Sequence, residues 1–242
     1  QKILDLFNSG RFDEAIITSK KLLKKNPNFA NLYNVIGLSF LKKKRLADAK
    51  SSFLKGLEID ENSIELSLNL GNFYKIEHSY DQAEKEFNKI LERNPNYLPA
   101  ILSYANLKST LNLKKESLSL YDRALSIQEN NFLIHYNKAF FLQTIADFEG
   151  AIYHAKRCLE LNPNFTLADV LLSKMIDHKK TNFHLDSMEQ KLSNKNLNPE
   201  DSANLLFSIA SVYEKKGNLK KNISLILEAN SLKRKHLNYD IN

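Results

Sequence analysis

One short motif that returns at a fixed interval constrains the fold of this chain more than any other feature. Asn-Pro-Asn followed by an aromatic residue begins at Asn26, Asn94 and Asn162, so that successive copies lie 68 residues apart. Midway between them stand the polar stretches 60–62 and 128–130, which halve the interval to 34 residues. A repeat of about 20–50 residues indicates an array of stacked supersecondary units, and about 34 is the length of one helix–turn–helix unit.

Four columns of residues recur in register with this period. Small residues fill the first two columns, a single residue type fills the third, and the fourth is rich in aromatic residues. The columns are Gly37, Gly71, Ala105, Ala139 and Ser173; Ala15, Ala49, Ala83, Ser117 and Ala151; Leu23, Leu57, Leu91, Leu125 and Leu159; and Ser19, Phe53, Phe87, Tyr121 and Ala155. Small residues let two helices approach closely, and aromatic residues fill the space beside them. We therefore predict that Gly71 faces a second helix and that Leu91 and Leu125 are almost fully buried.

The helix boundaries follow from residues that begin or stop helices. Asp13 and Asp81 fall at the start of the second helix of a pair, where a carboxylate faces the positive end of the helix dipole. Prolines cannot continue a helix and mark the unit boundaries. Near the C-terminus, Asn198 and Pro199 read as the cap and first turn of a new helix. We expect about six helical pairs after a partial first helix.

The domain organisation follows from where the pattern weakens. The helix expected at 166–179 keeps Ser173 in its column, but its partner at 183–192 lacks the small and aromatic residues. The small column then resumes three residues late, at Ala210. We expect a repeat array over residues 1–196, with a truncated first repeat and a degenerate last one. Residues 197–242 form a helical pair that continues or caps the array.

Composition narrows the class of protein. The chain is 43% hydrophobic, which suffices for a buried core, and no stretch is long and apolar enough to span a membrane. Its single cysteine, Cys158, excludes an internal disulfide and fits a reducing compartment, so we expect a cytoplasmic location. No signal peptide is visible, and the chain begins without methionine, so we take it as a fragment or a trimmed chain. We expect no cofactor.

The repeat columns resemble the tetratricopeptide repeat family. The match is carried by Asn69-Leu70-Gly71-Asn72-Phe73-Tyr74, followed by Ala83, Phe87 and Pro95, and it covers residues 1–165 well. The resemblance implies an all-α fold, a right-handed α-solenoid of helix–turn–helix repeats. It also implies a scaffold that binds a protein or an extended peptide in a concave groove lined by the first helices, with no catalysis of its own.

The C-terminal region carries a second, narrower resemblance. The stretches 205–210, 213–214, 217–218 and 228–235 are similar to a junction segment in bacterial proteins whose tetratricopeptide repeats precede a sulfotransferase domain. This resemblance implies an alternative function. The chain would be the N-terminal part of a sulfotransferase, with its repeats selecting or positioning an acceptor and a catalytic domain following residue 242.

Candidate binding residues come from the first helices. In enzymes that link N-acetylglucosamine to proteins, a ladder of asparagines on these helices holds an extended peptide by its backbone, and the matching positions here include several amides. Asparagine both donates and accepts hydrogen bonds, which suits backbone recognition. We expect a peptide groove formed by Asn69, Asn72, Asn106, Tyr136, Asn137 and Phe140. The lysines by which other family members clamp a C-terminal carboxylate are absent from their column, so we do not expect that mode.

Charged and metal-ligating residues offer weaker alternatives. Lysine runs such as 42–45 and 215–216 fall near the turns within units, where they offset the helix dipole or form an edge that binds a polyanion. No nucleic-acid motif accompanies them, so we do not expect a nucleic-acid partner. We assign His154 and Cys158 to core packing, expect His178 and His184 to be exposed, and expect no metal site. The sequence sets no oligomeric state.

Overall fold

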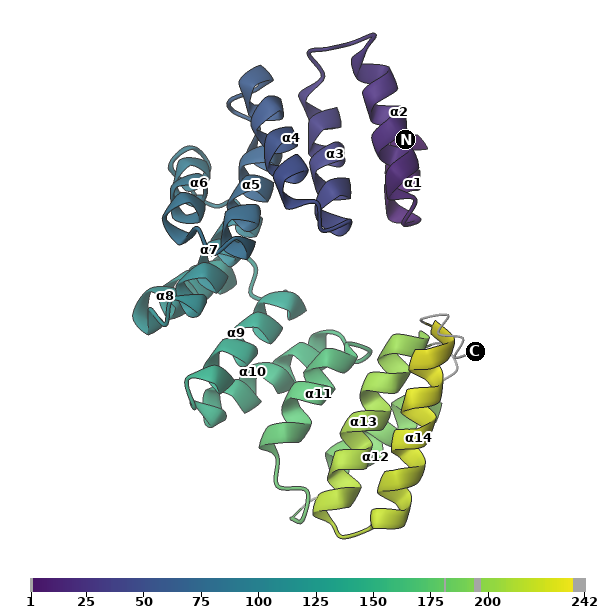
Figure 1. Ribbon diagram of the computed structural model, residues 1–242. Helices are drawn as coiled ribbons and strands as arrows, with labels where there is room; N and C mark the ends of the chain where they lie inside the picture. The colour runs from purple at the N-terminus through teal and green to yellow at the C-terminus, as the bar shows by residue number, and fades with distance from the viewer. Residues whose placement is uncertain (1, 181, 194–196, 237–242) are drawn as a thin grey trace. The chain divides into compact units, whose positions relative to one another are not determined.

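The computed structural model describes residues 2–180, 182–193 and 197–236 and contains fourteen helices and no strand in those ranges (Figure 1). The helices are α1 (Lys2–Asn8), α2 (Phe12–Leu23), α3 (Ala30–Lys42), α4 (Leu46–Ile59), α5 (Ile64–Ile76), α6 (Tyr80–Arg93), α7 (Leu98–Thr110), α8 (Lys114–Ile127), α9 (Phe132–Thr144), α10 (Phe148–Leu161), α11 (Thr166–Met175), α12 (Phe183–Ser193), α13 (Pro199–Lys215) and α14 (Leu219–His236). The short α1 is the partial first helix. The predicted fold class, an all-α solenoid of helix–turn–helix repeats, is confirmed.

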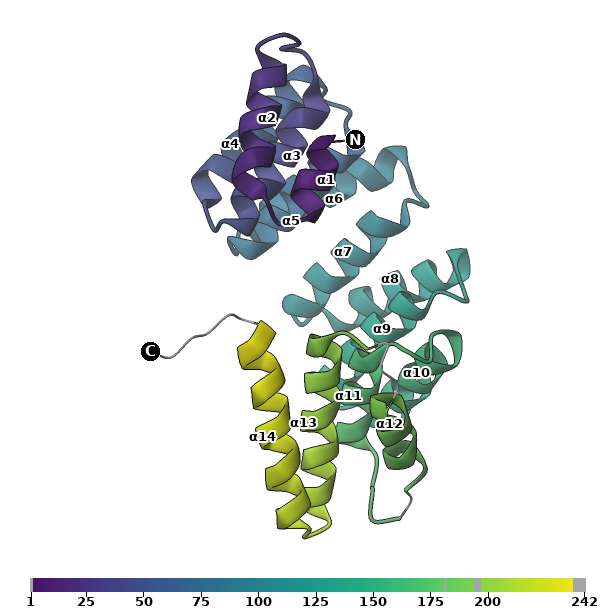
Figure 2. The ribbon, with the colours of Figure 1, turned by 90° about the vertical axis from the view of Figure 1, so that its right-hand side faces the viewer.

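The chain divides into two compact units, Gln1–Ile127 with α1 to α8 and Gln128–Asn242 with α9 to α14. Within each unit, consecutive helices pack as pairs, and both views show α13 and α14 side by side along their length (Figure 2). The predicted boundary between a repeat array and a C-terminal pair falls at 196/197. Residues 194–196 lie outside the described residues, so that division stays a prediction.

The turn inside six of the helical pairs repeats one backbone conformation. The second residue after the first helix takes a positive φ between 56° and 77° at Gly10, Lys44, His78, Asn112, Ala146 and Gly217. The next backbone N–H then reaches back to close the helix, as Arg45 N does to Phe40 O at 2.9 Å. This is the usual C-terminal cap, in which a residue in the left-handed conformation turns the chain so that the following N–H groups donate to the last carbonyls of the helix. Gly10 and Gly217 adopt it without steric cost, and in the other four of these turns the repeat imposes the conformation on another residue type.

The small and aromatic columns meet inside the pairs α3–α4 and α5–α6, as predicted. A Cβ added to Gly37 would lie 2.5 Å from the Phe53 ring, and one added to Gly71 would lie 2.6 Å from the Phe87 ring. Both rings are fully buried. Glycine is therefore required because the backbone of the first helix lies directly on the aromatic ring of the second helix.

The prediction that the leucine column is almost fully buried is wrong. Leu91 and Leu125 are only half-buried, whereas the residue before each, Ile90 and Ala124, is buried. A Cβ at the equivalent Gly56 would lie 2.7 Å from Leu66, on the first helix of the next pair. This column therefore faces the junction between pairs. Each leucine follows this column by one residue and is therefore rotated by about 100° around the helix axis, which places it at the edge of the junction.

The last units depart from the regular pattern. Helix α11 ends at Met175, four residues before the predicted end, and packs against α10 and α13 with few contacts to α12. Helix α12 instead places Leu185 and Met188 against Leu205 and Ile209 of α13. The predicted cap of α13 is confirmed, because Asn198 Oδ1 accepts a hydrogen bond from Asp201 N at 2.8 Å.

Candidate functional site

The predicted amides of the first unit lie on the first helices and are half-buried. Asn69 and Asn72 belong to α5, and Asn106 belongs to α7. Asn69 Nδ2 donates to Oδ1 of Asn34 on α3 at 2.8 Å, and Asn106 Oδ1 accepts from the Tyr121 hydroxyl at 2.5 Å. An asparagine amide can form about four hydrogen bonds, so both residues keep capacity for a ligand. They also have structural partners that the sequence did not reveal.

The other predicted residues, Tyr136, Asn137 and Phe140, lie on α9 in the second unit. The Tyr136 ring packs edge-to-face on Phe165 with centroids 5.0 Å apart, and burial raises the pKa of its phenol. Phe140 is 53% exposed. Of the two aromatic residues, Phe140 thus offers a ring to a partner, while Tyr136 supports the fold. Whether these six residues form one groove stays a prediction.

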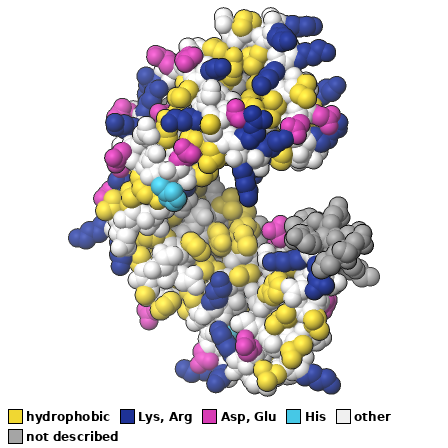
Figure 3. Space-filling view, in the orientation of Figure 1, with side chains coloured by type: hydrophobic (Ala, Val, Ile, Leu, Met, Phe, Trp, Pro, Cys, Tyr) yellow, Lys and Arg dark blue, Asp and Glu magenta, His cyan; other side chains and the backbone are white. Residues whose placement is uncertain are grey.

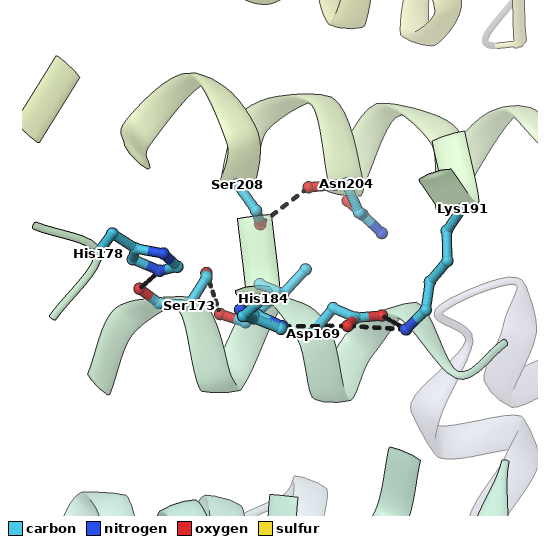
Figure 4. A network of polar contacts seen from close by, with 8 residues as sticks. Asp169, Ser173, His178, His184, Lys191, Asn204 and Ser208 are labelled. Atoms are coloured by element: carbon cyan, nitrogen blue, oxygen red, sulfur yellow. Dashed lines mark hydrogen bonds and ion pairs between the residues drawn. The ribbon is translucent and has the colours of Figure 1, made fainter. Parts of the chain in front are cut away.

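A buried polar network fixes α11 against α12 (Figure 4). The Asp169 carboxylate is fully buried and accepts from Lys191 Nζ at 2.6 and 2.8 Å and from His184 Nε2 at 3.1 Å. A buried carboxylate needs such partners, because loss of its hydration is otherwise uncompensated. Nearby, His178 Nε2 donates to Ser173 O at 3.1 Å.

The prediction that His178 and His184 are exposed is wrong, since they are 2% and 6% exposed. Helix α13 packs on α11 beside the turn that carries His178, and burial lowers the pKa of this histidine. His184 is buried because its ring turns inward to donate to Asp169. Sequence spacing placed both residues next to a turn but could not show which helix covers it.

A second pair of buried histidines links α9 to α10. His135 Nε2 donates to Glu129 O at 2.9 Å, which leaves His135 Nδ1 as an acceptor for His154 Nδ1 at 2.8 Å. Cys158, one turn after His154, is fully buried, and burial raises the pKa of its thiol to about 12. Within the described residues, no three or more His, Cys, Asp or Glu side chains converge on a position for a metal ion.

The basic runs have acidic neighbours. Lys43 pairs with Asp13 at 2.5 Å and Arg45 with Asp48 at 2.7 Å. In Figure 3, Lys and Arg side chains are interspersed with Asp and Glu side chains over the visible face. This mixture of charges favours the interpretation that the lysines are solvated and offset the dipoles of their helices. It argues against an edge that binds a polyanion. None of the described helices is long and apolar enough to cross a membrane.

Two grooves that the sequence reasoning missed lie between consecutive second helices. A groove of about 730 Å³ lies between α10 and α12 over α11, with Leu159, Leu172 and Ile176 in its lining. We call it the α10–α12 groove. A groove of about 560 Å³ lies between α2 and α4 over α3, and we call it the α2–α4 groove. Both volumes are within the range of about 300–1,000 Å³ that is usual for ligand sites.

Comparison with known proteins identifies the repeat. Residues 30–63 and 64–97, which contain the pairs α3–α4 and α5–α6, each match the family model for the tetratricopeptide repeat. Residues 30–97 are therefore similar to two consecutive tetratricopeptide repeats. The matched segments include Gly37, Phe53, Gly71 and Phe87, the residues that make the close helix contacts.

Several known proteins are similar to this chain in sequence or in structure. Anaphase-promoting complex subunit 3 of Schizosaccharomyces pombe is 24% identical over 162 residues, which are 67% of this chain and 24% of that protein. A tetratricopeptide repeat protein from Parabacteroides merdae superposes with a TM-score of 0.69 at 15% identity, over 96% of this chain and 90% of the other. A chain of the APC/C hetero-tetramer Cut9–Hcn1 gives a TM-score of 0.71 at 18% identity, over 95% of this chain and 45% of the other. The chain thus spans less than half of two of these relatives.

Proposed function

We propose that this chain is a scaffold that binds an extended segment of a partner protein along its first helices and performs no chemistry of its own. The observation that carries the proposal is the array of helical pairs, in which residues 30–97 match the tetratricopeptide repeat, and it is supported by the similarity to a subunit of the anaphase-promoting complex. In the first unit we assign a contact to the Asn72 amide on α5, and in the second unit, separately, to the exposed Phe140 ring on α9. Amides suit recognition of a peptide backbone, and aromatic side chains provide much of the anchoring energy at interfaces.

The test is a peptide-array screen of the chain, repeated on single alanine variants. Asn72→Ala and Phe140→Ala should weaken the selected peptides. Two variants on second helices serve as controls, Asn88→Ala on α6 and Phe148→Ala on α10, where Phe148 is as exposed as Phe140 at 53%. Asn106 is a poorer test residue, because its substitution also removes the bond from Tyr121. Affinities that fall equally in test and control variants, or in none, would contradict the proposal.

A second hypothesis, that the repeats precede a sulfotransferase domain, rests only on the short C-terminal resemblance over 205–235. None of the relatives reported above is a sulfotransferase. The test is the sequence that follows Asn242 in the intact gene, where a loop for binding a sulfonate-donor nucleotide would be required. A cytoplasmic location is likewise part of the proposal and is tested by fractionation of the native protein.

A further inference from the structure

The two grooves occupy the same position of the repeat, four repeats apart. In the α2–α4 groove, Ile16, Lys20 and Lys55 take the places that Ile152, Lys156 and Lys191 take in the α10–α12 groove. The correspondence extends to the floor, where Ile36 matches Leu172 and Phe40 matches Ile176, and to Ser51, which matches Ser187. One groove lies in each unit, and each is complete within its own unit. The repeat therefore builds one kind of groove twice.

Polar side chains bridge the equivalent position between α4 and α6. The place of Ile16 is taken there by Lys50, whose ammonium lies 5.2 Å from the centroid of the Tyr74 ring. Tyr74 itself is buried and occupies the place of Phe40. The cation–π contact thus joins the second helix to the first across this position.

An ion-pair bridge spans the next position, between α6 and α8. Glu84 replaces the isoleucine, and its carboxylate accepts from Lys108 Nζ at 2.8 Å. Lys108 also pairs with Glu116 of α8 at 2.8 Å and is only 5% exposed. Three consecutive helices are linked across what would otherwise be a groove. In the α10–α12 groove an isoleucine, Ile152, takes the place of Lys50 and Glu84 and provides no such bridge. In the α2–α4 groove the isoleucine is Ile16, but Lys20 and Arg45 lie 5.6 Å and 4.6 Å from the centroid of the Phe40 ring, so a cation–π contact is present there as well.

A lysine accompanies each open groove. Lys20 and Lys156 stand at the rim, while the bridged positions have Leu54 and Asn88 in their place. Both lysines are exposed, and no carboxylate of a described residue forms an ion pair with either. The Lys20 ammonium lies 5.6 Å from the centroid of the Phe40 ring, whereas the Lys156 ammonium is available to an anionic ligand.

The other charges of the α10–α12 groove have partners. Glu160 pairs with Arg157 at 2.9 Å, and Asp177 lies 3.7 Å from Lys180. Lys191 is held by Asp169 in the buried network. Lys156 is thus the cation of this groove that is left to bind a carboxylate, beside an apolar floor.

We propose that the α10–α12 groove binds a segment of a partner protein that carries a large apolar side chain beside an acidic residue. The apolar side chain packs on Leu159, Leu172 and Ile176, and the carboxylate pairs with Lys156. The α2–α4 groove takes the same class of ligand through Lys20. This inference rests on the proposed function, because it assumes a protein partner, but it places the contact between second helices rather than along the first helices.

The experiment uses the full chain and acidic, leucine- or phenylalanine-containing peptides taken from the array. Lys156→Glu reverses the rim charge, and Ser187→Trp fills the groove from α12 without altering a buried residue. Matched controls are Lys220→Glu, an exposed lysine on α14, and Gln190→Trp, an exposed position on α12. Both groove variants should weaken binding at least about tenfold, which is about 1.4 kcal/mol, and both controls should bind as the unchanged chain does. Circular dichroism confirms folding, and if Ser187→Trp fails to fold, Lys156→Glu decides alone.

The other outcomes separate the two proposals. Peptides that bind all four variants equally would overturn the groove and leave the scaffold function standing. Failure of every array peptide to bind would overturn both. A medium-chain fatty acid, dodecanoate, is measured in parallel. If the groove variants weaken its binding but leave peptide binding unchanged, the groove takes a lipid-like carboxylate and the peptide inference is wrong.

Discussion

Replacing Gly71 with alanine tests the close helix contact on which each repeat depends. The added Cβ would lie 2.6 Å from Phe87 Cε1 and 3.0 Å from Cδ1. Carbon atoms in favourable contact are about 3.5–4.0 Å apart, so the ring or the helix must move by about 1 Å. The Phe87 ring is fully buried and cannot swing into solvent. The strain therefore has to be absorbed by the pair α5–α6 itself.

Two effects of opposite sign set the magnitude. Overpacking a filled core costs about 1–3 kcal/mol. Alanine is favoured over glycine in a helix by about 0.5–1 kcal/mol. The net loss of stability should therefore be about 0.5–2 kcal/mol. Phe87→Leu removes the ring edge that the new methyl group meets, so in that background Gly71→Ala should cost little or should stabilise the chain.

The assay is a double-mutant cycle of Gly71→Ala and Phe87→Leu. The chain has no tryptophan, so urea unfolding is followed by far-ultraviolet circular dichroism. Repeat arrays can lose units one at a time, and hydrogen exchange of the α5 and α6 amides therefore reports the local opening free energy. A Gly71→Ala chain as stable as the original, or an equal penalty with and without the Phe87 ring, would refute the steric argument.

Three further predictions follow from burial and backbone geometry. Ile90→Ala should lower the free energy of unfolding by about 2–5 kcal/mol, and Leu91→Ala should lower it clearly less, because Leu91 is only half-buried. Urea unfolding measures both losses, and a larger loss for Leu91→Ala would contradict the burial described above. Burial lowers the pKa of His135 in the folded second unit. Below about pH 6.5 this histidine is therefore protonated in the unfolded chain but stays neutral in the folded unit, so the melting temperature of the second unit should fall between pH 7 and 5. A melting temperature that does not change over this pH range would contradict the prediction. Ala146→Gly should raise the free energy of unfolding by about 1 kcal/mol, because glycine adopts the φ of 63° without strain, and a lower melting temperature would contradict this.

Much of the fold could be predicted because repetition amplifies weak signals. A single glycine in a helix predicts little about packing. Gly37 and Gly71 recur in step with Phe53 and Phe87, and this recurrence predicted the contacts that the structure contains. The same reasoning failed for the leucine column. A residue that recurs in every unit marks a fixed place on the helix, but how deeply that place is buried depends on the next pair, as Leu91 beside Ile90 shows.

The candidate site was less predictable because it depends on contacts between distant residues. Asn106 was chosen for its place in the repeat, and its bond to Tyr121 is visible only in three dimensions. His184 follows a turn in sequence but is drawn inward by the buried Asp169. The grooves depend on whether a side chain such as Lys108 spans neighbouring helices, which no single column of the repeat records.

The contacts of Gly37 and Gly71 with the aromatic ring of the following helix also bear on how the chain folds. Gly37 meets Phe53, and Gly71 meets Phe87, across a single short turn. Contacts between residues close in sequence cost little loop entropy, so chains dominated by them fold quickly and can begin at more than one place. Each helical pair then acts as a seed on which its neighbour assembles. Duplication or loss of a whole 34-residue unit would leave the seeding contacts of every other pair intact.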